Sequence, residues 1–240
     1  MGSSSHETVQ EHKEDPGEYV IIQLPDPKLF KFAPNFLKGC DNIKKSTYSD
    51  SEYNGQIKDG KRNGKGIMSW NNGDVYQGEF KDGYRHGKGI YKYNSGAIYN
   101  GEWNMGFAEG WGIMKYTDSY YEGEWKKDKR NGKGKMIWTD ENGKGIIIYE
   151  GEFKDGYRHG KGICKYKKTG EIYDGEWKND KKNGKGKMTW TDYKWKGDVY
   201  QGEFKDDLRH GKGVYIWKND DIYDGEWTNG LKHGRGNFKK

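Results

Sequence analysis

Apolar and polar residues alternate with a period of two in short segments along residues 53–240. In residues 76–80, Tyr-Gln-Gly-Glu-Phe, the tyrosine, glycine and phenylalanine share one face of an extended strand, and the glutamine and glutamate share the other. Residues 81–86 are polar and supply turn chemistry, and residues 87–93 alternate again. Two alternating segments joined by a short polar turn predict a β-hairpin.

This hairpin pattern occurs eight times, at intervals of 22 to 28 residues. Each unit begins with a tyrosine, and the residues eleven and thirteen positions later are glycines in every unit. A regular internal repeat of this length indicates a repeat architecture. The structural repeat positions are the tyrosines Tyr53, Tyr76, Tyr99, Tyr121, Tyr149, Tyr173, Tyr200 and Tyr223, and the second glycines Gly66, Gly89, Gly112, Gly134, Gly162, Gly186, Gly213 and Gly236.

The alternation also predicts a register inside each hairpin, because directly opposed residues of an antiparallel pair point to the same face. Glycine weakens a strand, so glycines at fixed positions indicate that aromatic rings lie flat on the backbone there, with packing between neighbouring units. An opposed glutamate and lysine would add a few tenths to ~1 kcal/mol. The expected pairs in the second unit are Gly78 with Gly89, Tyr76 with Tyr91, Phe80 with Gly87 and Glu79 with Lys88.

An isolated hairpin is marginally stable in water, so the units are expected to stack side by side. The predicted fold is all-β: an elongated, twisted, single-sheet array of stacked antiparallel β-hairpins with an irregular N-terminal tail. The predicted organisation is a partly disordered tail at residues 1–52 and eight repeats at residues 53–240.

The pattern Y-x-G-E-W-x-x-G-x-x-x-G-x-G resembles the MORN repeat (membrane occupation and recognition nexus) over residues 53–240. The resemblance implies an elongated array of hairpins. MORN proteins recur in radial-spoke heads and other ciliary parts, in apicomplexan cytoskeletal rings, at membrane junctions, and beside phosphoinositide-kinase or methyltransferase domains. No such domain accompanies the repeats in this sequence, so the resemblance implies a scaffold or interaction subunit.

Composition agrees with a thin sheet rather than a closed aliphatic core. Hydrophobic residues make up 31% of the chain, charged residues make up 33%, and the mean hydropathy is -1.27. These values would indicate disorder, but the chain has 10 Trp, 19 Tyr and 8 Phe, and disordered chains contain few aromatics. Cys40 and Cys164 are too few for a disulfide framework or a zinc site, which fits a reducing compartment.

Targeting signals are equally sparse. The N-terminus is Ser-rich and acidic, unlike a signal peptide, and the apolar run at residues 19–22 is too short to span a bilayer. A cytoplasmic location is therefore expected. The net charge of +6 is far below that of a nucleic-acid-binding domain of this length, so no nucleic-acid partner is expected.

Stacking of the units would line up the basic residues of the predicted turns as a basic ladder along one edge of the array. Such a ladder attracts acidic protein tails or anionic lipid. The alternative is that its charge keeps an exposed sheet soluble and prevents wrong pairing. The candidate partner-binding residues of the ladder are Lys61, Arg62, Arg85, Lys129, Arg130, Arg158, Lys181, Lys182 and Arg209.

Three other candidate contacts depart from the repeat. The third unit replaces the basic pair with Phe107-Ala108-Glu109 and continues to Trp111, which indicates either a contact site or sequence drift. Trp195 lies in an insertion at residues 193–196, where its alternative role is packing on the adjacent hairpin. Another insertion spans residues 141–145, and insertions in repeats form loops on one side of the array.

No catalytic, cofactor or metal site is expected. His86, His159, His210 and His233 recur at one repeat position, where neighbouring copies would be about 10 Å apart and too distant to share an ion. The repeat glutamates form a regular row, so no pair is singled out for acid–base chemistry.

The segment before the repeats has a different composition. Phe30, Phe32, Phe36 and Leu37 are apolar anchors, and residues 19–36 are expected to cap or wrap the first hairpin. The alternative is docking of a partner by strand addition. The last unit stops after Phe238 with no capping element in the sequence, so a partner subunit or self-association is expected to cover the open sheet end.

These features favour a non-catalytic scaffold subunit that mediates protein–protein contacts in a cytoskeletal assembly, and the resemblance points to the ciliary axoneme. Its expected partners are other proteins of that assembly. One alternative is a peripheral membrane adaptor that contacts anionic lipid weakly through the basic ladder. Another is a regulatory module that acts on an enzyme in trans.

Overall fold

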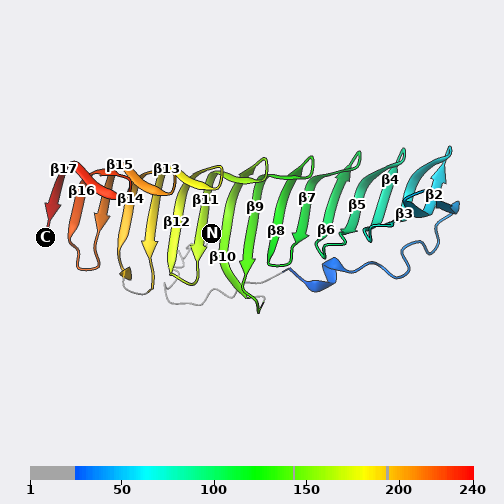
Figure 1. Cartoon of the computed structure of the whole chain (residues 1–240), viewed down its shortest axis with the longest axis horizontal. Coiled ribbons are helices and arrows are strands. Elements are labelled where there is room, and N and C mark those ends of the chain that lie inside the picture. Colours follow the sequence, from blue (N-terminus) through cyan, green and yellow to red (C-terminus); the bar gives the residue numbers. More distant parts are fainter. Residues whose placement is uncertain (1–24, 143, 193–194) are drawn as a thin grey trace, which may run out of the picture.

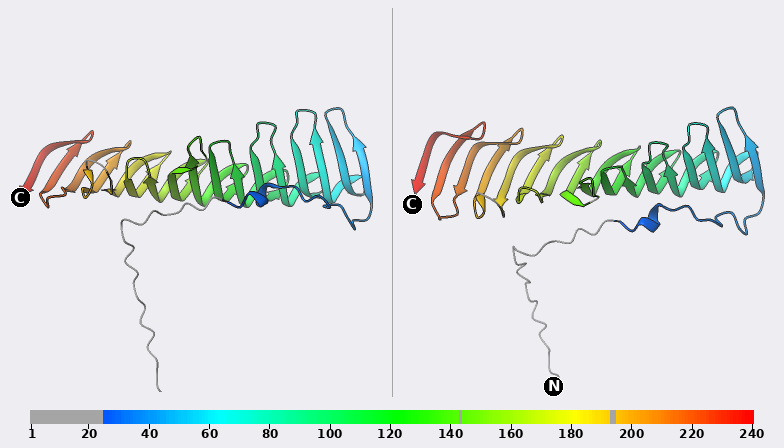
Figure 2. Two further views of the ribbon diagram at one scale, coloured as in Figure 1. Left: turned by 90° about the horizontal axis from the view of Figure 1, so that it is seen from below. Right: turned by 60° about the horizontal axis from the view of Figure 1, so that its bottom comes forward.

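A computed structural model describes residues 25–142, 144–192 and 195–240. These residues form one antiparallel sheet of 17 strands, in which each strand pairs with the next along the chain. Figure 1 shows the result as an elongated array of hairpins, and the two views of Figure 2 show the twist that runs along it. The predicted all-β fold, a twisted single-sheet array, is confirmed.

The elements follow the sequence in order. A short 3-10 helix, η1 (Pro27–Phe30), precedes the sheet. The strands are β1 (Ile43–Thr47), β2 (Ser51–Lys58), β3 (Lys61–Trp70), β4 (Val75–Lys81), β5 (Tyr84–Lys92), β6 (Ile98–Asn104), β7 (Phe107–Lys115), β8 (Ser119–Lys126), β9 (Lys129–Thr139), β10 (Gly145–Lys154), β11 (Tyr157–Tyr166), β12 (Glu171–Lys178), β13 (Lys181–Trp190), β14 (Val199–Lys205), β15 (Leu208–Ile216), β16 (Ile222–Thr228) and β17 (Leu231–Lys239).

Each of the eight units is a hairpin closed by a two-residue turn. In the second unit the turn is Asp82-Gly83, with φ of 51° and 90°. Positive φ at both positions is the type I′ geometry that matches strand twist, and Asp, Asn and Gly tolerate it. The turn is therefore shorter than the predicted polar segment, and residues 84–86 belong to β5.

The predicted register is right at one end of the hairpin and wrong at the other. Gly78 faces Gly89 as expected, but a bulge follows, and Glu79 and Phe80 face His86 and Arg85 instead of Lys88 and Gly87. The short turn forces this shift, because it brings β5 back to pairing earlier than a six-residue turn would. Pairs of the expected residue types, Phe with Gly and Glu with Lys, form between hairpins instead. Phe80 faces Gly64 and Glu79 faces Lys65, both in the preceding unit.

The bulge explains the first repeat glycine and the repeat glutamate. Gly87 has a φ of 57°, in the left-handed region, and the Glu79 carboxylate accepts a hydrogen bond from the Lys88 backbone N–H at 3.3 Å. The carboxylate thus partners an amide that the bulge removes from the ladder. In the first unit Gln56 stands in place of glutamate, and its Oε1 accepts the Lys65 N–H at 2.8 Å.

The second repeat glycine lies beneath the repeat tyrosine of its own unit, whereas the sequence predicted ring-on-glycine packing between neighbouring units. A Cβ atom on Gly78 or Gly89 would come closer than 3.0 Å to the Tyr76 side chain. The Tyr76 hydroxyl donates to the Glu79 carbonyl oxygen at 2.9 Å, which holds the ring flat on its own hairpin. The ring therefore covers a glycine pair inside one unit rather than a glycine of a neighbouring unit.

Neighbouring units then pack through ring edges. Tyr76 makes edge-to-face contacts with Phe80 of its own unit, at 5.2 Å between ring centroids, and with Trp103 of the next unit, at 5.3 Å. Tyr149 makes the same pair of contacts with Phe153 and Trp177. Such pairs are favoured over face-to-face stacking, and they link the units into one continuous aromatic row.

The repeat fold predicts a specific penalty at Gly162. Gly162→Ala would drive a Cβ into the Tyr149 ring, so we expect a loss of about 1–3 kcal/mol in the free energy of unfolding, measured by chemical denaturation. The matched control is Lys161→Ala, an exposed neighbour on the opposite face, which should leave stability nearly unchanged. Equal effects of the two substitutions would contradict the ring-on-glycine packing.

The buried tyrosines also predict an alkaline transition. Burial raises the pKa of Tyr53 and Tyr200 to about 12, and it raises the pKa of five other repeat tyrosines, Tyr76, Tyr99, Tyr121, Tyr149 and Tyr173. An unfolded phenol ionises near pH ~10, so this stability is complete below that pH and is lost as the pH rises through ~12. Tyrosinate absorbance should therefore rise together with loss of the circular dichroism of the sheet. Ionisation of these seven tyrosines near pH ~10 with the sheet intact would contradict the coupling between ionisation and unfolding.

Candidate interaction surfaces

The array offers three surfaces to partners. The ring face carries the repeat tyrosines, and the polar face is its opposite, bearing for example Gln77 and Ile90. The turn edge is the row of first residues after each two-residue turn: Lys61, Tyr84, Phe107, Lys129, Tyr157, Lys181, Leu208 and Leu231.

The arginines of the predicted basic ladder lie on the ring face, in the strand that follows each turn. The Arg85 guanidinium stacks over the Trp103 ring at 4.3 Å and donates to the carbonyl oxygen of Gly106, in the turn of the next hairpin, at 2.6 Å. Arg158 stacks over Trp177 at 4.2 Å, and Arg209 over Trp227 at 4.4 Å. These arginines latch each hairpin to its successor through cation–π and charge-assisted hydrogen bonds.

The latch varies with its aromatic partner. Arg62 and Arg130 lie 5.7 and 5.5 Å from Phe80 and Phe153 and donate to the turn carbonyls of Gly83 and Gly156. Where the second turn residue is aspartate, its carboxylate takes part. Asp180 accepts from both the backbone N–H and the Nε of Arg158, and Asp207 accepts from the Lys182 N–H.

Ionisation follows this packing. Burial opposes the charge of Arg158, but the hydrogen bond to Asp180 favours it, and the pKa of Arg158 is raised. Burial lowers the pKa of Lys182 and of Arg209. The ladder residues therefore differ in their surroundings: Arg158 has a carboxylate partner that stabilises its charge, whereas burial dominates at Lys182 and Arg209.

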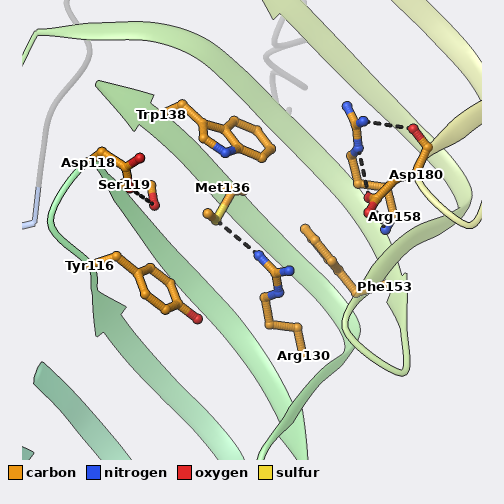
Figure 3. Close-up of a pocket in the computed structure, with 9 residues that line it drawn as sticks. All are labelled: Tyr116, Asp118, Ser119, Arg130, Met136, Trp138, Phe153, Arg158 and Asp180. Atoms are coloured by element: carbon orange, nitrogen blue, oxygen red, sulfur yellow. Dashed lines mark hydrogen bonds and ion pairs between the residues drawn. The ribbon is translucent and has the colours of Figure 1, made fainter. Parts of the chain in front are cut away.

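Arg130 and Arg158 flank a hollow of the ring face, drawn in Figure 3. The hollow has a volume of about 450 Å³, and Tyr116, Trp138 and Phe153 contribute its rings. Arg158 is paired with Asp180, whereas Arg130 contacts the Met136 sulfur at 3.5 Å. Asp118 and Asp180 also line the hollow, so its arginine charges lie beside carboxylates.

The remaining ladder residues, Lys61, Lys129 and Lys181, are exposed on the turn edge. The predicted contact Phe107 occupies the same repeat position and is 46% exposed. Four residues that the sequence reasoning missed share this row: Tyr84, Tyr157, Leu208 and Leu231, which are 46–73% exposed. A sequence signal for these residues exists: each is an apolar residue directly after a turn. Tyr84 faces Lys81 and Tyr157 faces Lys154, so these side chains point to the polar face and away from the rings.

The other two predicted contacts are separate from this row. Trp111 lies on the polar face opposite Glu124 and is 48% exposed. Trp195 is 49% exposed and lines a hollow of about 390 Å³ with Trp190, Phe204 and Leu208. The described residues of the insertions, 141, 142 and 144 before β10 and 195 and 196 before β14, lie in connections on the side of the array opposite the two-residue turns, and Gly145 begins β10.

The polar face of the first four units carries the N-terminal segment. The Gln77 side-chain amide binds both backbone groups of Ala33, at 2.7 and 3.2 Å, and Asn100 donates to the Leu29 carbonyl oxygen at 2.7 Å. Phe30 is 5% exposed and packs on Tyr120. Residues 25–36, whose blue trace follows the sheet in Figure 1, thus lie along several hairpins, and residues 19–24 of the predicted cap or wrap lie outside the described part.

The first hairpin also has a cap of its own. Strand β1 pairs with β2, from Ile43 opposite Gln56 to Thr47 opposite Glu52. No strand is predicted there from the sequence, because Ile43 is the only strongly apolar residue of β1. At the far end every residue of β17 is exposed.

Metal and membrane signatures are lacking in the described residues. They contain no cluster of three or more His, Cys, Asp or Glu side chains able to hold a metal ion. Across the same ranges, no helix combines the length and apolar character needed to cross a bilayer.

Comparison with known proteins identifies the repeats. The family model "MORN repeat" matches residues 53–75, 76–98, 99–119, 121–145, 149–170, 173–194, 200–222 and 223–239. No curated protein matches the chain. Among solved structures, the TCP domain of SAS-4 (dCPAP) of Drosophila melanogaster, in complex with a proline-rich motif of Ana2 (dSTIL), is 13% identical over 94% of this chain and 99% of that chain. Its TM-score of 0.35 is too low to bear on fold or function.

The arginine latch predicts different roles for two neighbouring basic residues. Arg158→Ala removes a cation–π contact, a salt bridge and hydrogen bonds to Asp180, so we expect a loss of about 1–3 kcal/mol in unfolding free energy. Lys181→Ala removes one exposed ion pair and should cost less than ~1 kcal/mol. Chemical denaturation of both variants measures the difference. A larger effect at Lys181 would refute the latch.

Proposed function

The chain belongs to the MORN repeat family, and we propose that it is a scaffold whose turn edge binds other proteins of a cytoskeletal assembly. MORN repeats are generally non-enzymatic and occur in repeat proteins that bind proteins or membranes. As the assembly we propose the ciliary axoneme, with a cytoplasmic location, because MORN repeats recur in ciliary parts.

The turn-edge row carries this proposal. Five apolar side chains recur at one repeat position, and each is 46% or more exposed. Successive units are two strands apart, so the row presents contacts every ~10 Å. Apolar side chains exposed in a regular row are typical of a protein-binding surface, and the lysines between them favour an acidic partner.

The use of the arginines favours a protein over a lipid surface. Arg62, Arg85, Arg130, Arg158 and Arg209 each donate to a backbone carbonyl of the following turn. Their charge is directed into the sheet, so an anionic membrane would meet mainly the lysines of the turn edge. An adaptor that relied on the basic ladder would present the guanidinium groups outward.

The proposal includes one further contact, at the end of the sheet. All nine residues of β17 are exposed, and among the described strands β17 pairs with β16 alone, which leaves its outer side as a sheet edge. Such an edge readily pairs with another strand, which here belongs to a partner subunit or a second copy.

The test compares two fourfold variants. Tyr84→Ser, Phe107→Ser, Tyr157→Ser and Leu208→Ser together remove four of the five apolar residues of the row. The control on the polar face is Lys88→Ser, Glu122→Ser, Lys133→Ser and Glu150→Ser, all at exposed positions. We expect pull-down from native cells to recover axonemal proteins with the wild type and the control. The apolar variant should lose them while keeping its thermal stability.

Liposome flotation separates the scaffold from a membrane adaptor. Salt-sensitive binding to anionic vesicles that disappears when Lys61, Lys129 and Lys181 become glutamate would overturn the scaffold in favour of a membrane adaptor. Recovery of a kinase or methyltransferase alone in the pull-down would support the regulatory module instead.

A further inference from the structure

Nine consecutive residues, Asp-Val-Tyr-Gln-Gly-Glu-Phe-Lys-Asp, occur twice, at residues 74–82 and 198–206. In the first copy Gln77 is 6% exposed, because its amide holds the Ala33 backbone. In the second copy Gln201 is exposed, and no described residue forms a hydrogen bond with its amide. The same strand therefore has an occupied and an open version of one peptide-binding site.

The open version lies in a groove of the polar face. This groove has a volume of about 710 Å³ and crosses β11 to β15 around Gln201. Four lysines line it, Lys161, Lys185, Lys187 and Lys212. Its glutamates Glu176 and Glu203 each accept the backbone N–H of a bulge, so the uncommitted charge of the groove is positive.

Apolar residues adjoin the groove along the same face. Ile163, in β11, is 39% exposed and faces Asp174 of β12. Ile172, Val199 and Ile216 are half-buried and lie one step along their strands. An occupant of this surface therefore combines an extended apolar stretch with acidic residues.

The N-terminal segment already travels toward this groove. From Phe36 over Lys65 of β3 to Phe30 over Lys115 of β7, the segment crosses the strands in the direction of increasing repeat number when followed toward the N-terminus. Phe30 lies at β7, seven strands or about 34 Å from Gln201 in β14. The 3-10 turn at Pro27–Phe30 covers about 6 Å of this span at ~2.0 Å per residue, and the remaining ~28 Å needs about eight extended residues at ~3.3–3.6 Å each, which places residues 18–20 at Gln201.

We propose that residues 18–24 of the same chain occupy this groove, with their backbone near Tyr19 held by the Gln201 amide as Gln77 holds Ala33. The chemistry is complementary. Residues 19–24, Tyr-Val-Ile-Ile-Gln-Leu, supply the apolar stretch for Ile163 and its neighbours, and Glu18 supplies an acidic group for Lys187 and Lys212, the lysines on the two strands beside Gln201. The N-terminal segment then covers the polar face from the first unit to the seventh, which leaves the turn edge and ring face to partners. This inference does not depend on the proposed function.

Cross-linking in the full-length chain tests the proposal. Tyr19→Cys and Gln201→Cys are introduced together with Cys40→Ser, and Cys164 stays in place because it is fully buried. A short bifunctional maleimide should join positions 19 and 201 within one chain. We expect the reaction to be at least about tenfold faster than for Tyr19→Cys with Asp206→Cys, an exposed turn residue at the end of the same strand.

Two further arms make the result decisive. Adding Lys185→Glu and Lys187→Glu should reduce the cross-linking to the control rate, while circular dichroism shows the sheet intact. Mixing two differently tagged copies separates linkage within a chain from linkage between chains. Equal rates at positions 201 and 206 would overturn the proposal, and so would products that join two copies, which would make a second molecule the occupant.

Discussion

A tyrosine ring lying flat on two opposed glycines is the contact on which this structure depends. A 240-residue chain with 31% hydrophobic residues has too little aliphatic mass for a layered core. Each hairpin instead buries one ring against its own backbone, and Tyr53, Tyr76, Tyr121 and Tyr149 are completely buried in a sheet one layer thick. The glycines make this burial possible, because any Cβ at their positions would occupy the space of the ring.

The remaining repeat residues follow from keeping that ring in place. The two-residue turn shortens the hairpin, so the strand behind the glycine pair must bulge, and the bulge needs a left-handed glycine and an acceptor for its amide. The arginine then closes each unit onto the next turn. Stability in such an array is mainly a sum over neighbouring units, so each unit must supply its own copy of the whole set.

Features that follow from the alternation of side chains along a strand could be predicted from the sequence. Features that depend on one extra residue in a strand, such as the β-bulge, could not. Strand alternation and the Tyr–Gly coincidence were enough for the hairpins, the single sheet and the pairing of Gly78 with Gly89. The bulge was missed because the side-chain pattern looks the same whether Glu79 faces Lys88 across its own hairpin or Lys65 of the unit before. The sequence pattern places the arginines in turns. The actual turn is shorter, so Arg85 belongs to β5 and stacks on the Trp103 ring.

The polar face shows how a repeat can hold local information without disturbing the ring packing. The residue after each repeat tyrosine points away from the rings and is free to vary. It is an amide in the first three units, Asn54, Gln77 and Asn100, where the N-terminal segment lies, and acidic in the next three, Glu122, Glu150 and Asp174. An amide can both donate to and accept from a peptide backbone, whereas a carboxylate only accepts. An amide returns at Gln201, in an exact copy of the strand that holds Ala33. Unlike the carboxylates of the three preceding units, it can therefore bind both the N–H and the carbonyl group of a peptide backbone.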